Sequence, residues 1–324
     1  MKNKKPRILD SIQTRVLVYH PTQASQYAAI LQDMGLHEIT WAGDLDTAAA
    51  NMKGVEVVFG WQIPAAWIAQ WPDIRWVQWT GAGVDRAFDS SFRWPPSVRL
   101  TRIVDQFGSD IAEYVFAYVL FLTKDIESLR QGQQARLWQP RVLPRLAGKV
   151  MGVAGVGSIG REIVHRARAF DMQVYGMTAH SPGAGILDRR FGPEQWPEFV
   201  RDLDFLVLTL PLTSHTRGVV HSGILNRLKA DAVIINVGRG ELVDEQALQA
   251  HLQMGRIRGA VLDVFSEEPL APDSALWSTP NLLVTPHLSG PTRVEQACQF
   301  FAENLLQYVQ ERPLSGLVDM NQQY

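Results

Sequence analysis

The sequence predicts an α/β protein built from two doubly wound domains, each with a parallel sheet. Three observations lead to this prediction. Short β-branched runs alternate with amphipathic stretches along the whole chain, which is the pattern of strand–helix–strand units. The length of 324 residues is about twice the ~150 residues of a common domain. A glycine-rich turn follows an apolar strand near the middle of the chain, where a second series of strands begins.

The first series of elements occupies the first third of the chain. Apolar β-branched and aromatic runs indicate its strands, and amphipathic stretches indicate its helices, the first of which Gly35 ends. In chain order the elements are expected at Val16–Tyr19 (strand), Ala24–Met34 (helix), Val55–Phe59 (strand), Pro64–Gln70 (helix) and Trp76–Trp79 (strand).

The second series starts at Lys149 and is richer in strands. Its strands are expected at Val150–Ala154, Gln173–Met177, Phe205–Leu210, Ala232–Val237, Gly259–Val264 and Leu282–Thr285. Its helices are expected at Ser158–Phe170, Ser222–Leu228, Glu245–Met254 and, past the last strand, Val294–Gln310.

A domain crossover is expected between the two series. Asp110–Leu129 has the pattern of one long helix, and a polar arm rich in glutamine and arginine follows from Arg130 to Arg145. After the last strand a helix and a tail remain, which we expect to pack back on the first domain. The predicted domains are therefore residues 1–109 together with 291–324, and residues 110–290.

Composition excludes several classes of function. Lysine and arginine number 31 against 33 aspartates and glutamates, and the formal net charge of −2 provides no strong attraction to nucleic acid or to an anionic membrane. Cys298 is the single cysteine, and the eight histidines are scattered, so neither a disulfide nor a metal site is expected. The longest apolar run, Tyr114–Thr123, is far shorter than the ~20 residues that span a bilayer. No secretory signal is recognised, and we expect a soluble cytoplasmic protein.

The strand at Val150–Ala154 runs into Gly155-Val156-Gly157-Ser158-Ile159-Gly160, a G-x-G-x-x-G loop that opens a helix. Gly155 permits the tight turn, Gly157 lets a pyrophosphate approach the backbone, and Gly160 lets the helix and strand pack closely. A purely structural turn is the alternative, but the strand before the loop and the five strands after it favour a nicotinamide dinucleotide. Residues 110–290 are therefore predicted to form the dinucleotide-binding, Rossmann-like domain.

The second strand of this domain ends in Thr178-Ala179-His180, without the acid that NAD-binding proteins usually carry there. Repulsion against a 2′-phosphate is therefore missing. His180, Arg189 and Arg190 could attract that phosphate, although a charged surface loop is an alternative interpretation. We expect NADP(H) to be favoured, with NAD(H) as the other possibility.

Three polar residues follow three later strands and are expected at the sheet edge that carries the glycine loop. They are Arg239, Glu268 and His287. An arginine can pair with a substrate carboxylate and polarise its carbonyl, a histidine can pass a proton, and a glutamate can hold the imidazole. Each could by itself be a surface residue, but their joint placement predicts 2-keto acid reduction.

In the first domain, the strand Trp76–Trp79 leads into a glycine-rich turn, Gly81-Ala82-Gly83. Its backbone N–H groups could bind a carboxylate, and the alternative is an ordinary tight turn. Trp79 lies beside this turn, and we expect it to line the substrate pocket.

These residues together resemble the D-isomer-specific 2-hydroxyacid dehydrogenases over nearly the whole chain. The resemblance rests on Gly81–Asp85, the Gly155–Gly160 loop, Leu210–Thr213 with Thr216, Asn236–Asp244, Leu262–Leu270 and Thr285–His287. Within the family, Val264–Leu270 and Trp138 make the chain most similar to glyoxylate/hydroxypyruvate reductases of the bacterial A type.

The resemblance implies two domains with the active site in the cleft between them, residues 1–109 and 291–324 binding substrate. It implies Arg239, Glu268 and His287 as the catalytic trio, and a homodimer built on the cofactor domain, in which Trp138 reaches the partner's pocket. The implied substrate-binding residues are Trp79, Gly81, Ala82, Gly83 and Arg239. Thr178-Ala179 is where the chain departs from the family, with neither the NAD-type acid nor the arginine of many NADP-type members. The residue patterns and the resemblance together give these expected cofactor-binding residues: Gly155, Gly157, Ser158, Ile159, Gly160, Thr178, Ala179, His180, Leu210, Pro211, Thr216, Val237, Gly238 and Asp263, the last near the nicotinamide amide.

Several functions therefore remain in competition. The leading hypothesis is reduction of a small 2-keto acid, such as glyoxylate or hydroxypyruvate, to the D-2-hydroxy acid. A phosphoglycerate dehydrogenase is the second, although the tail after Gln310 is too short for a regulatory domain. A non-enzymatic NAD(P)H-sensing binding protein is the third, and a methyltransferase is weaker. Related formate dehydrogenases carry glutamine where Glu268 stands, which argues against formate oxidation.

Overall fold

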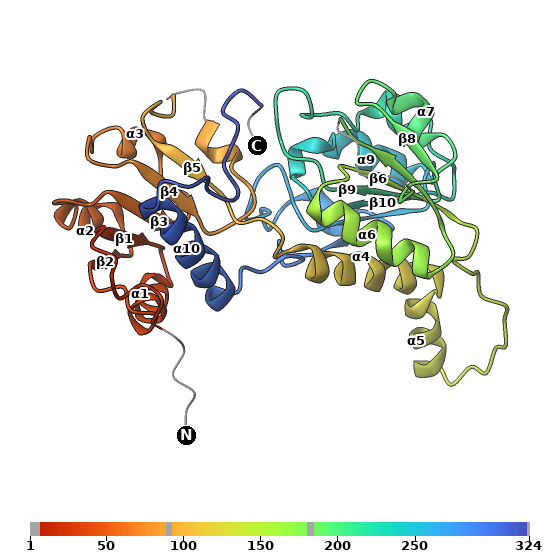
Figure 1. The fold of residues 1–324 in the computed structure, drawn as a ribbon. Coiled ribbons are helices and arrows are strands. Elements are labelled where there is room, and N and C mark those ends of the chain that lie inside the picture. The colour runs from red at the N-terminus through yellow and green to blue at the C-terminus, as the bar shows by residue number, and fades with distance from the viewer. Residues whose placement is uncertain (1–6, 89–92, 180–184, 323–324) are drawn as a thin grey trace. The chain divides into compact units, whose positions relative to one another are not determined.

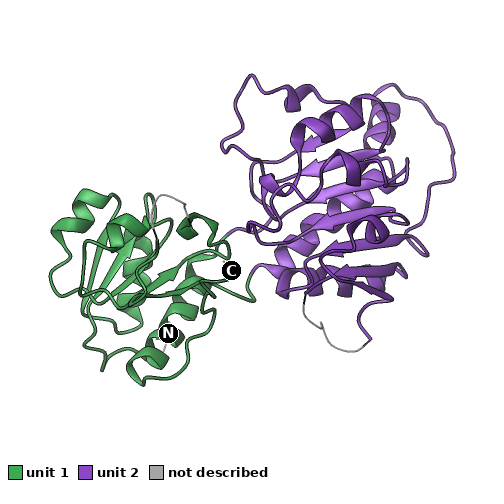
Figure 2. Cartoon of the chain, turned by 90° about the horizontal axis from the view of Figure 1, so that it is seen from above, with its two compact units in different colours: residues 1–106, 292–324 green, residues 107–291 purple. Residues whose placement is uncertain are grey.

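The structure is a computed structural model that describes residues 7–88, 93–179 and 185–322. The chain divides into two compact units, shown in different colours in Figure 2. Unit 1 contains residues 1–106 and 292–324, and unit 2 contains residues 107–291. The sequence placed the two boundaries at 109/110 and 290/291, a few residues from those of the units.

Unit 1 has a five-stranded parallel sheet with the strand order β2-β1-β3-β4-β5. Its strands are β1 (Val16–Tyr19), β2 (Ile39–Ala42), β3 (Val57–Gly60), β4 (Trp76–Trp79) and β5 (Arg99–Thr101). Its helices are α1 (Ala24–Asp33), α2 (Leu45–Ala50), α3 (Ala65–Ile68), the 3-10 helix η1 (Asp85–Phe88) and α10 (Val294–Val309).

Helix α10, from the C-terminal part of the chain, completes the core of unit 1. Phe301 stacks on Phe59 with ring centroids 4.3 Å apart. The buried side chain of Asn304 donates a hydrogen bond of 3.0 Å to the side-chain oxygen Oε1 of Gln78 on β4. The same oxygen accepts the Thr101 hydroxyl of β5 at 2.8 Å. Stacked rings and a satisfied polar network therefore attach α10 to the sheet.

Unit 2 has a seven-stranded, fully parallel sheet with the order β12-β11-β10-β9-β6-β7-β8. Its strands are β6 (Val150–Ala154), β7 (Gln173–Met177), β8 (Arg189–Phe191), β9 (Phe205–Leu208), β10 (Val233–Asn236), β11 (Gly259–Leu262) and β12 (Leu282–Val284). Its helices are α4 (Gly108–Thr123), α5 (Ile126–Gln134), α6 (Ser158–Ala169), α7 (Trp196–Val200), α8 (Ser222–Leu225), α9 (Glu245–Gln253) and the 3-10 helices η2 (Gly240–Leu242) and η3 (Ala275–Ser278).

The strand order of unit 2 defines where its site lies. The chain winds from β6 outward to β8, then returns to β9 on the other side of β6 and continues to β12. This reversal beside β6 is a topological switch point. In sheets of this kind, ligands bind at the switch point, outside the carboxyl ends of the strands. The predicted fold class of two doubly wound parallel-sheet domains is confirmed.

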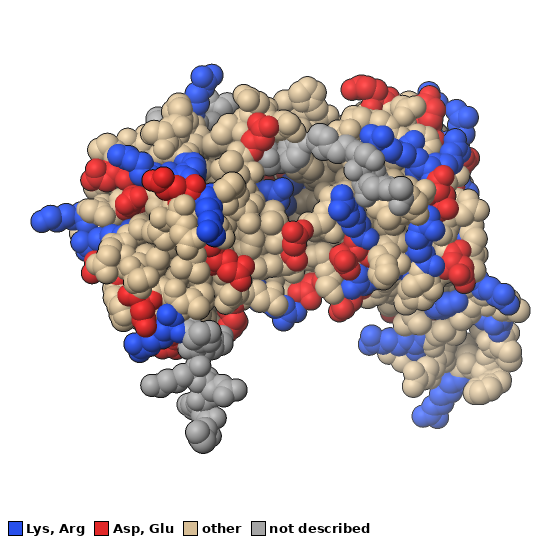
Figure 3. Space-filling view, in the orientation of Figure 1, with Lys and Arg blue, Asp and Glu red and all other residues tan. Residues whose placement is uncertain are grey.

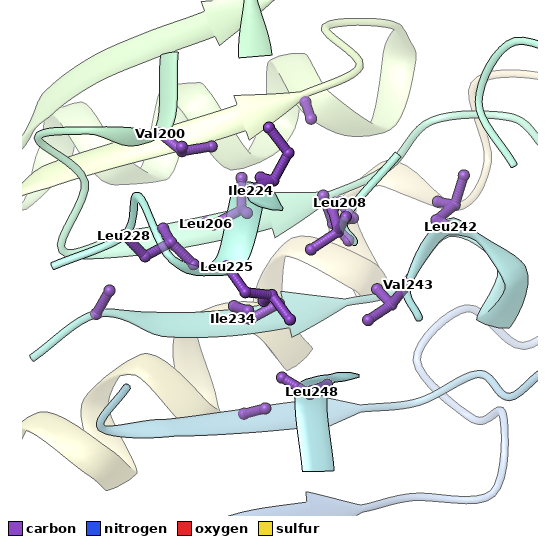
Figure 4. Close-up of a cluster of buried hydrophobic side chains, with 14 of the residues drawn as sticks. Val200, Leu206, Leu208, Ile224, Leu225, Leu228, Ile234, Leu242, Val243 and Leu248 are labelled. Carbon is purple, nitrogen blue, oxygen red and sulfur yellow. The ribbon is translucent and has the colours of Figure 1, made fainter. Parts of the chain in front are cut away.

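Apolar side chains hold helices on the faces of this sheet. In Figure 4, Leu206 and Leu208 of β9 and Ile234 of β10 lie beside Ile224 and Leu225 of α8, all of them buried. Helices α4 and α6 pack against each other, as Figure 1 shows. Because apolar helices cover the sheet, its strands are continuous apolar runs, which is why the sequence pattern locates them well.

The structure corrects the prediction of one long helix over Asp110–Leu129. Helix α4 ends with Lys124 as its C-cap, and Asp125 takes a left-handed φ of 48° before α5 begins. The chain changes direction there, and α5 buries none of its residues. In Figure 1, α5 projects from the rest of unit 2 before a loop leads to β6. The polar arm predicted from Arg130 therefore begins inside a second helix.

Other differences concern elements with weak apolar patterns. Strands β2, β5 and β8 and helices α2 and α7 were not expected. The three missed strands all lie at the edges of their sheets, where one face or end remains exposed and the apolar run is short. Several strands of unit 2 also end one or two residues before the predicted positions.

The surface contains both signs of charge. On the face shown in Figure 3, lysine and arginine side chains are interspersed with aspartate and glutamate. Across the described residues, no helix is long and apolar enough to cross a membrane.

A buried carboxylate joins the amino ends of the unit 2 strands, at the edge opposite the glycine loop. Asp204, which precedes β9, is 5% exposed and accepts the backbone N–H of Val150 at 2.7 Å. It also accepts the ammonium groups of Lys149 at 3.0 Å and Lys229 at 2.5 Å. Burial alone would raise the pKa of Asp204, but the bonds from Lys229, Val150 and Lys149 together outweigh burial and lower it.

We predict that Asp204→Asn destabilises the protein by about 1–3 kcal/mol at pH 7, because it removes charge-assisted hydrogen bonds. Because the pKa of Asp204 is lower in the folded state than its unfolded value of 3.8, the ionised carboxylate stabilises the fold fully at pH values above 3.8. This stabilisation is lost as the pH falls from 3.8 through the pKa of the folded state. Urea unfolding of wild type and variant at pH 7 and near pH 3 measures both effects.

Asp231→Asn is the matched control. Asp231 approaches the same two lysines, at 3.8 and 3.9 Å, but its side chain is 57% exposed. We expect a change below about 1 kcal/mol for this surface pair. Equal losses in the two variants would contradict the assignment of stability to the buried carboxylate.

Candidate active site

Two glycines of the loop after β6 are required by close packing. Gly155 has a φ of +100°, and a Cβ there would lie 2.9 Å from the backbone nitrogen of Leu210. A Cβ on Gly160 would lie 2.1 Å from the Gly155 carbonyl oxygen. Any side chain at either position would displace backbone, so the turn and the approach of α6 to β6 both depend on glycine.

The middle glycine has a different environment. Nothing lies within 4 Å of where a Cβ on Gly157 would be. Gly157 is the N-cap of α6 and provides no side-chain hydrogen bond to the helix, whose first residues are Ser158 and Ile159. Open space above a twelve-residue helix start fits an anionic pyrophosphate, because the first N–H groups of a helix lack partners within it. The residues present therefore fit a dinucleotide.

The two arginines beside the end of β7 lie in different environments. Strand β8 pairs with β7, so Arg189 and Arg190 project to opposite faces of the sheet. Arg190 donates a weak 3.4 Å hydrogen bond to the Ala179 carbonyl oxygen, directly after Thr178. Arg189 instead lies over the ring of Tyr175 at 5.2 Å and near Asp202 at 3.9 Å. Of the two, Arg190 is the one at the end of β7, and His180 lies outside the described residues.

The loop after β9 lies against the glycine loop. The Thr209 hydroxyl donates to the Gly155 carbonyl oxygen at 2.6 Å. Further along, the Thr216 hydroxyl donates to the Pro211 carbonyl oxygen at 2.7 Å and closes the turn. A Cβ on Gly238 would lie 3.0 Å from the Leu210 carbonyl oxygen, so the loops after β9 and β10, the latter with Val237, run side by side.

Arg239 is held on the loop after β10 by its neighbours. The Asn236 side chain donates to the Arg239 carbonyl oxygen at 2.8 Å and accepts the Gly238 N–H at 3.1 Å. The guanidinium donates to the Gly238 carbonyl oxygen at 2.7 Å. Gly240 packs on the backbone of Phe265, where a Cβ would lie 1.9 Å from its carbonyl carbon. The loop of Arg239 therefore contacts the loop that leads to Glu268.

Glu268 and His287 form a hydrogen-bonded pair. His287 Nδ1 lies 2.8 Å from Glu268 Oε2, and Glu268 Oε1 accepts the Phe265 N–H at 3.0 Å. The carboxylate is thus fixed by its own loop and fixes the ring in turn. With Nδ1 facing the carboxylate, Nε2 is the nitrogen left for a reacting group. The imidazole is about half exposed, as a group that meets a substrate must be.

Asp263 connects β11 to the loop of His287. Its side chain is 0% exposed. Its carboxylate accepts the Thr285 hydroxyl at 2.6 Å and the N–H groups of Leu288 and Ser289, each at 2.9 Å. All of these contacts are with the histidine loop, and its predicted place at the nicotinamide amide stays a prediction.

In unit 1, the turn Gly81–Gly83 follows β4, as expected, but the aromatic residue over it is not Trp79. Trp79 is 1% exposed and belongs to the core of unit 1, which corrects the expectation that it lines a pocket. A Cβ on Gly81 would lie 2.2 Å from the ring of Trp61, which is only partly buried. Arg102, which follows β5, reaches the Ala82 carbonyl oxygen at 3.4 Å.

Sequence reasoning missed Trp61, Arg102 and the partners of Asp263. Trp61 and Arg102 each follow a strand of unit 1, and the rule that located Arg239 and His287 would have found them. Among the described residues, no group of three or more histidine, cysteine, aspartate or glutamate side chains could hold a metal ion.

Comparison with known proteins defines the class of this chain. The family profile described as "D-isomer specific 2-hydroxyacid dehydrogenase, NAD binding domain" matches residues 116–289, more than half of the chain. The chain belongs to the D-isomer specific 2-hydroxyacid dehydrogenase family. The predicted family is confirmed, and with it the prediction of an NAD(P)-dependent oxidoreductase of 2-hydroxy and 2-keto acids.

Individual relatives are similar over almost their full length. The chain is 29% identical over 315 residues to glyoxylate/hydroxypyruvate reductase A of Yersinia enterocolitica, covering 95% of this chain and 99% of that one. A solved structure of a family protein from Aeromonas salmonicida is 30% identical with a TM-score of 0.86, covering 95% and 100% of the two chains. One from Xanthobacter autotrophicus, in complex with NADPH and MES, is 29% identical with a TM-score of 0.84, covering 96% and 100%.

Proposed function

We propose that this protein reduces a small 2-keto acid of the glyoxylate or hydroxypyruvate type to the D-2-hydroxy acid and prefers NADPH. The observation that carries the proposal is the 2.8 Å pair of His287 and Glu268 on the sheet that holds the glycine loop, with Arg239 on the adjoining loop. The name of the Yersinia relative supports this substrate class.

The chain's own residues provide binding, orientation and a proton. When bound, the nicotinamide cofactor supplies the hydride. His287 Nε2 donates the proton to the carbonyl oxygen as that oxygen gains electrons, and Glu268 stabilises the protonated ring and fixes its orientation. The hydrogen bond from the Phe265 N–H to Glu268 ties the carboxylate to its own loop.

Arg239 binds and polarises the substrate. Its planar guanidinium can form two parallel hydrogen bonds to a carboxylate, and it also withdraws electron density from the neighbouring carbonyl. Asn236 fixes the backbone of this loop from both sides of Gly238. The cation is therefore presented by a rigid turn, which reduces the entropy that substrate binding must overcome.

In unit 1, we assign the substrate carboxylate to the backbone N–H groups of Gly81–Gly83. The ring of Trp61 over Gly81 makes the surface beside this turn apolar and bulky, which favours a substrate with a short side chain. The cleft between the domains, in which both sets of residues would meet a substrate, stays a prediction of the family resemblance.

The preference for NADPH rests on the end of β7. Thr178 and Ala179 bring no carboxylate there, and Arg190 places its guanidinium beside them. A 2′-phosphate would meet a cation without an opposing acid on this strand end. The NADPH complex of the Xanthobacter relative supports this cofactor.

We also propose a homodimer formed through α5 and the loop after it. Five apolar side chains stand exposed there, with Trp138 at 93% and Val142 at 99%. A concentration of exposed apolar side chains of this kind marks an interaction surface. The five residues are Ile126, Leu129, Leu137, Trp138 and Val142. A cytoplasmic location and the lack of nucleic-acid partners stay predictions from the sequence.

We predict that His287→Ala lowers kcat for glyoxylate reduction by about 10²–10⁴-fold, because general acid catalysis is lost. Binding of NADPH, measured by fluorescence titration, should be unchanged. His165→Ala, which removes an exposed histidine from α6, is the matched control and should keep wild-type turnover. Near-normal turnover in His287→Ala would remove this residue from the mechanism.

For the cofactor, Thr178→Asp should shift the ratio of kcat/KM for NADPH and NADH towards NADH, because a carboxylate accepts ribose hydroxyls and repels a 2′-phosphate. Thr178→Val controls for the loss of the hydroxyl and should not produce this shift. Arg190→Ala should lower the preference for NADPH, whereas Arg189→Ala, on the other face of the sheet, should not. A wild-type preference for NADH, insensitive to all four changes, would place discrimination elsewhere.

For assembly, sedimentation of the wild type should give twice the chain mass of 36.3 kDa. The double change Leu137→Asp and Trp138→Asp should yield monomers, because it buries charge in the proposed interface. Trp41→Asp, at another exposed tryptophan, should remain dimeric. A monomeric wild type, or a dimer that survives the double change, would contradict the proposed interface.

A further inference from the structure

A chain of hydrogen bonds runs from helix α4 to the loop of His287. The hydroxyl of Tyr114 on α4 lies 2.6 Å from the hydroxyl of Thr285, just past β12. The Thr285 hydroxyl donates to Asp263 Oδ1, also at 2.6 Å. Tyr114, Thr285 and Asp263 are distant in sequence, and neither bond is part of the sheet or of a helix. The proposed reaction assigns no role to Tyr114 or Thr285.

The direction of each bond follows from the chemistry of the groups. An aspartate carboxylate accepts hydrogen bonds, and here it already accepts two backbone N–H groups. The single proton of the Thr285 hydroxyl is therefore directed at Asp263, so Tyr114 must be the donor to Thr285. Burial raises the pKa of Tyr114, which keeps its phenol protonated and able to donate.

Asp263, the last group in this series of hydrogen bonds, holds the backbone conformation around His287. The carboxylate of Asp263 accepts the N–H groups of Leu288 and Ser289. The backbone carbonyl oxygen of Asp263 accepts the N–H of His287 at 2.8 Å. His287 has a φ of 48°, a left-handed conformation that costs energy for a residue other than glycine. Bonds on both sides of His287 hold this conformation.

Helix α4 contacts the same loop at a second point. A Cβ on Gly290 would lie 2.9 Å from the side chain of Ile111, which stands three residues before Tyr114 and so on the same face of the helix. The loop from Thr285 to Gly290 thus contacts α4 at both ends. The helix provides a fixed reference for the loop, since it also packs along α6.

We propose that Tyr114 and Thr285 are positioning residues that set the placement of His287 through Asp263. This inference rests on the proposed function, because it takes His287 as the proton donor. The hydroxyls themselves do not touch the reacting atoms. Their bonds keep both oxygens of Asp263 directed at the loop, and the imidazole is then held between a fixed backbone and the Glu268 carboxylate.

The test uses hydroxyl deletion and hydroxyl rescue. Thr285→Val and Tyr114→Phe each remove one hydroxyl at nearly constant volume, and we expect kcat for glyoxylate to fall about three- to ten-fold, as the loss of one hydrogen bond allows. KM for NADPH should stay constant. Thr285→Ser, which keeps the hydroxyl, should recover most of the wild-type kcat. The double variant should lose less than the product of the two single losses, because both act through Asp263.

Tyr175→Phe is the control for removal of a phenol elsewhere in unit 2 and should leave kcat unchanged. A second readout does not depend on activity: the amide hydrogens of Leu288 and Ser289 should exchange faster in Thr285→Val and at the wild-type rate in Thr285→Ser. A wild type that reduces no keto acid would refute the proposed function, while the exchange rates would still decide the structural part.

Three results would overturn the positioning role. The first is wild-type kcat in both deletion variants. The second is a Thr285→Ser variant as impaired as Thr285→Val, which would indicate a role in packing rather than hydrogen bonding. The third is unchanged amide exchange at Leu288 and Ser289 in Thr285→Val.

Discussion

Parallel pairing of all seven strands is the constraint on which the site of unit 2 depends. Parallel strands bring every carboxyl end to the same edge, so residues from different parts of the chain meet there without a dedicated scaffold. The glycine loop, Arg239, Glu268 and His287 all follow strands of this sheet. The reversal of strand order between β6 and β9 makes that edge a topological switch point, where ligands bind in sheets of this kind.

The two edges of the sheet have separate tasks. At the carboxyl edge, the imidazole of His287 is about half exposed, and the positions of His287 and Arg239 depend on loops. At the amino edge, Asp204 is buried and its oxygens accept hydrogen bonds from two lysines and a backbone N–H. Substitutions at one edge should affect chemistry, and those at the other stability. This division lets loops at the functional edge adopt strained conformations, such as the left-handed backbone of His287.

The sequence was sufficient for elements and residues that follow from local pattern. Buried strands such as β6 are continuous apolar runs, and Arg239 and His287 follow such runs directly, so both were predictable. Edge strands such as β8 lack that pattern, and the break at Asp125 depends on one left-handed residue. Burial of Trp79 could not be predicted because an aromatic residue before a glycine turn can face either the core or solvent. Hydrogen bonds between Tyr114, Thr285 and Asp263 join distant segments, and only the fold brings them together.

The discontinuity of unit 1 has a consequence for how the protein is made. Phe301 and Asn304 of α10 belong to the core of the unit whose first strand begins at Val16. On the ribosome, the N-terminal segment is synthesised first, yet it cannot bury its core until the last helix has emerged. Unit 2 has all its strands beforehand and can fold while its neighbour waits. Until α10 has been made, the aromatic-rich sheet of unit 1 therefore lacks the helix that completes its core, and the apolar surface that Phe301 covers stays open.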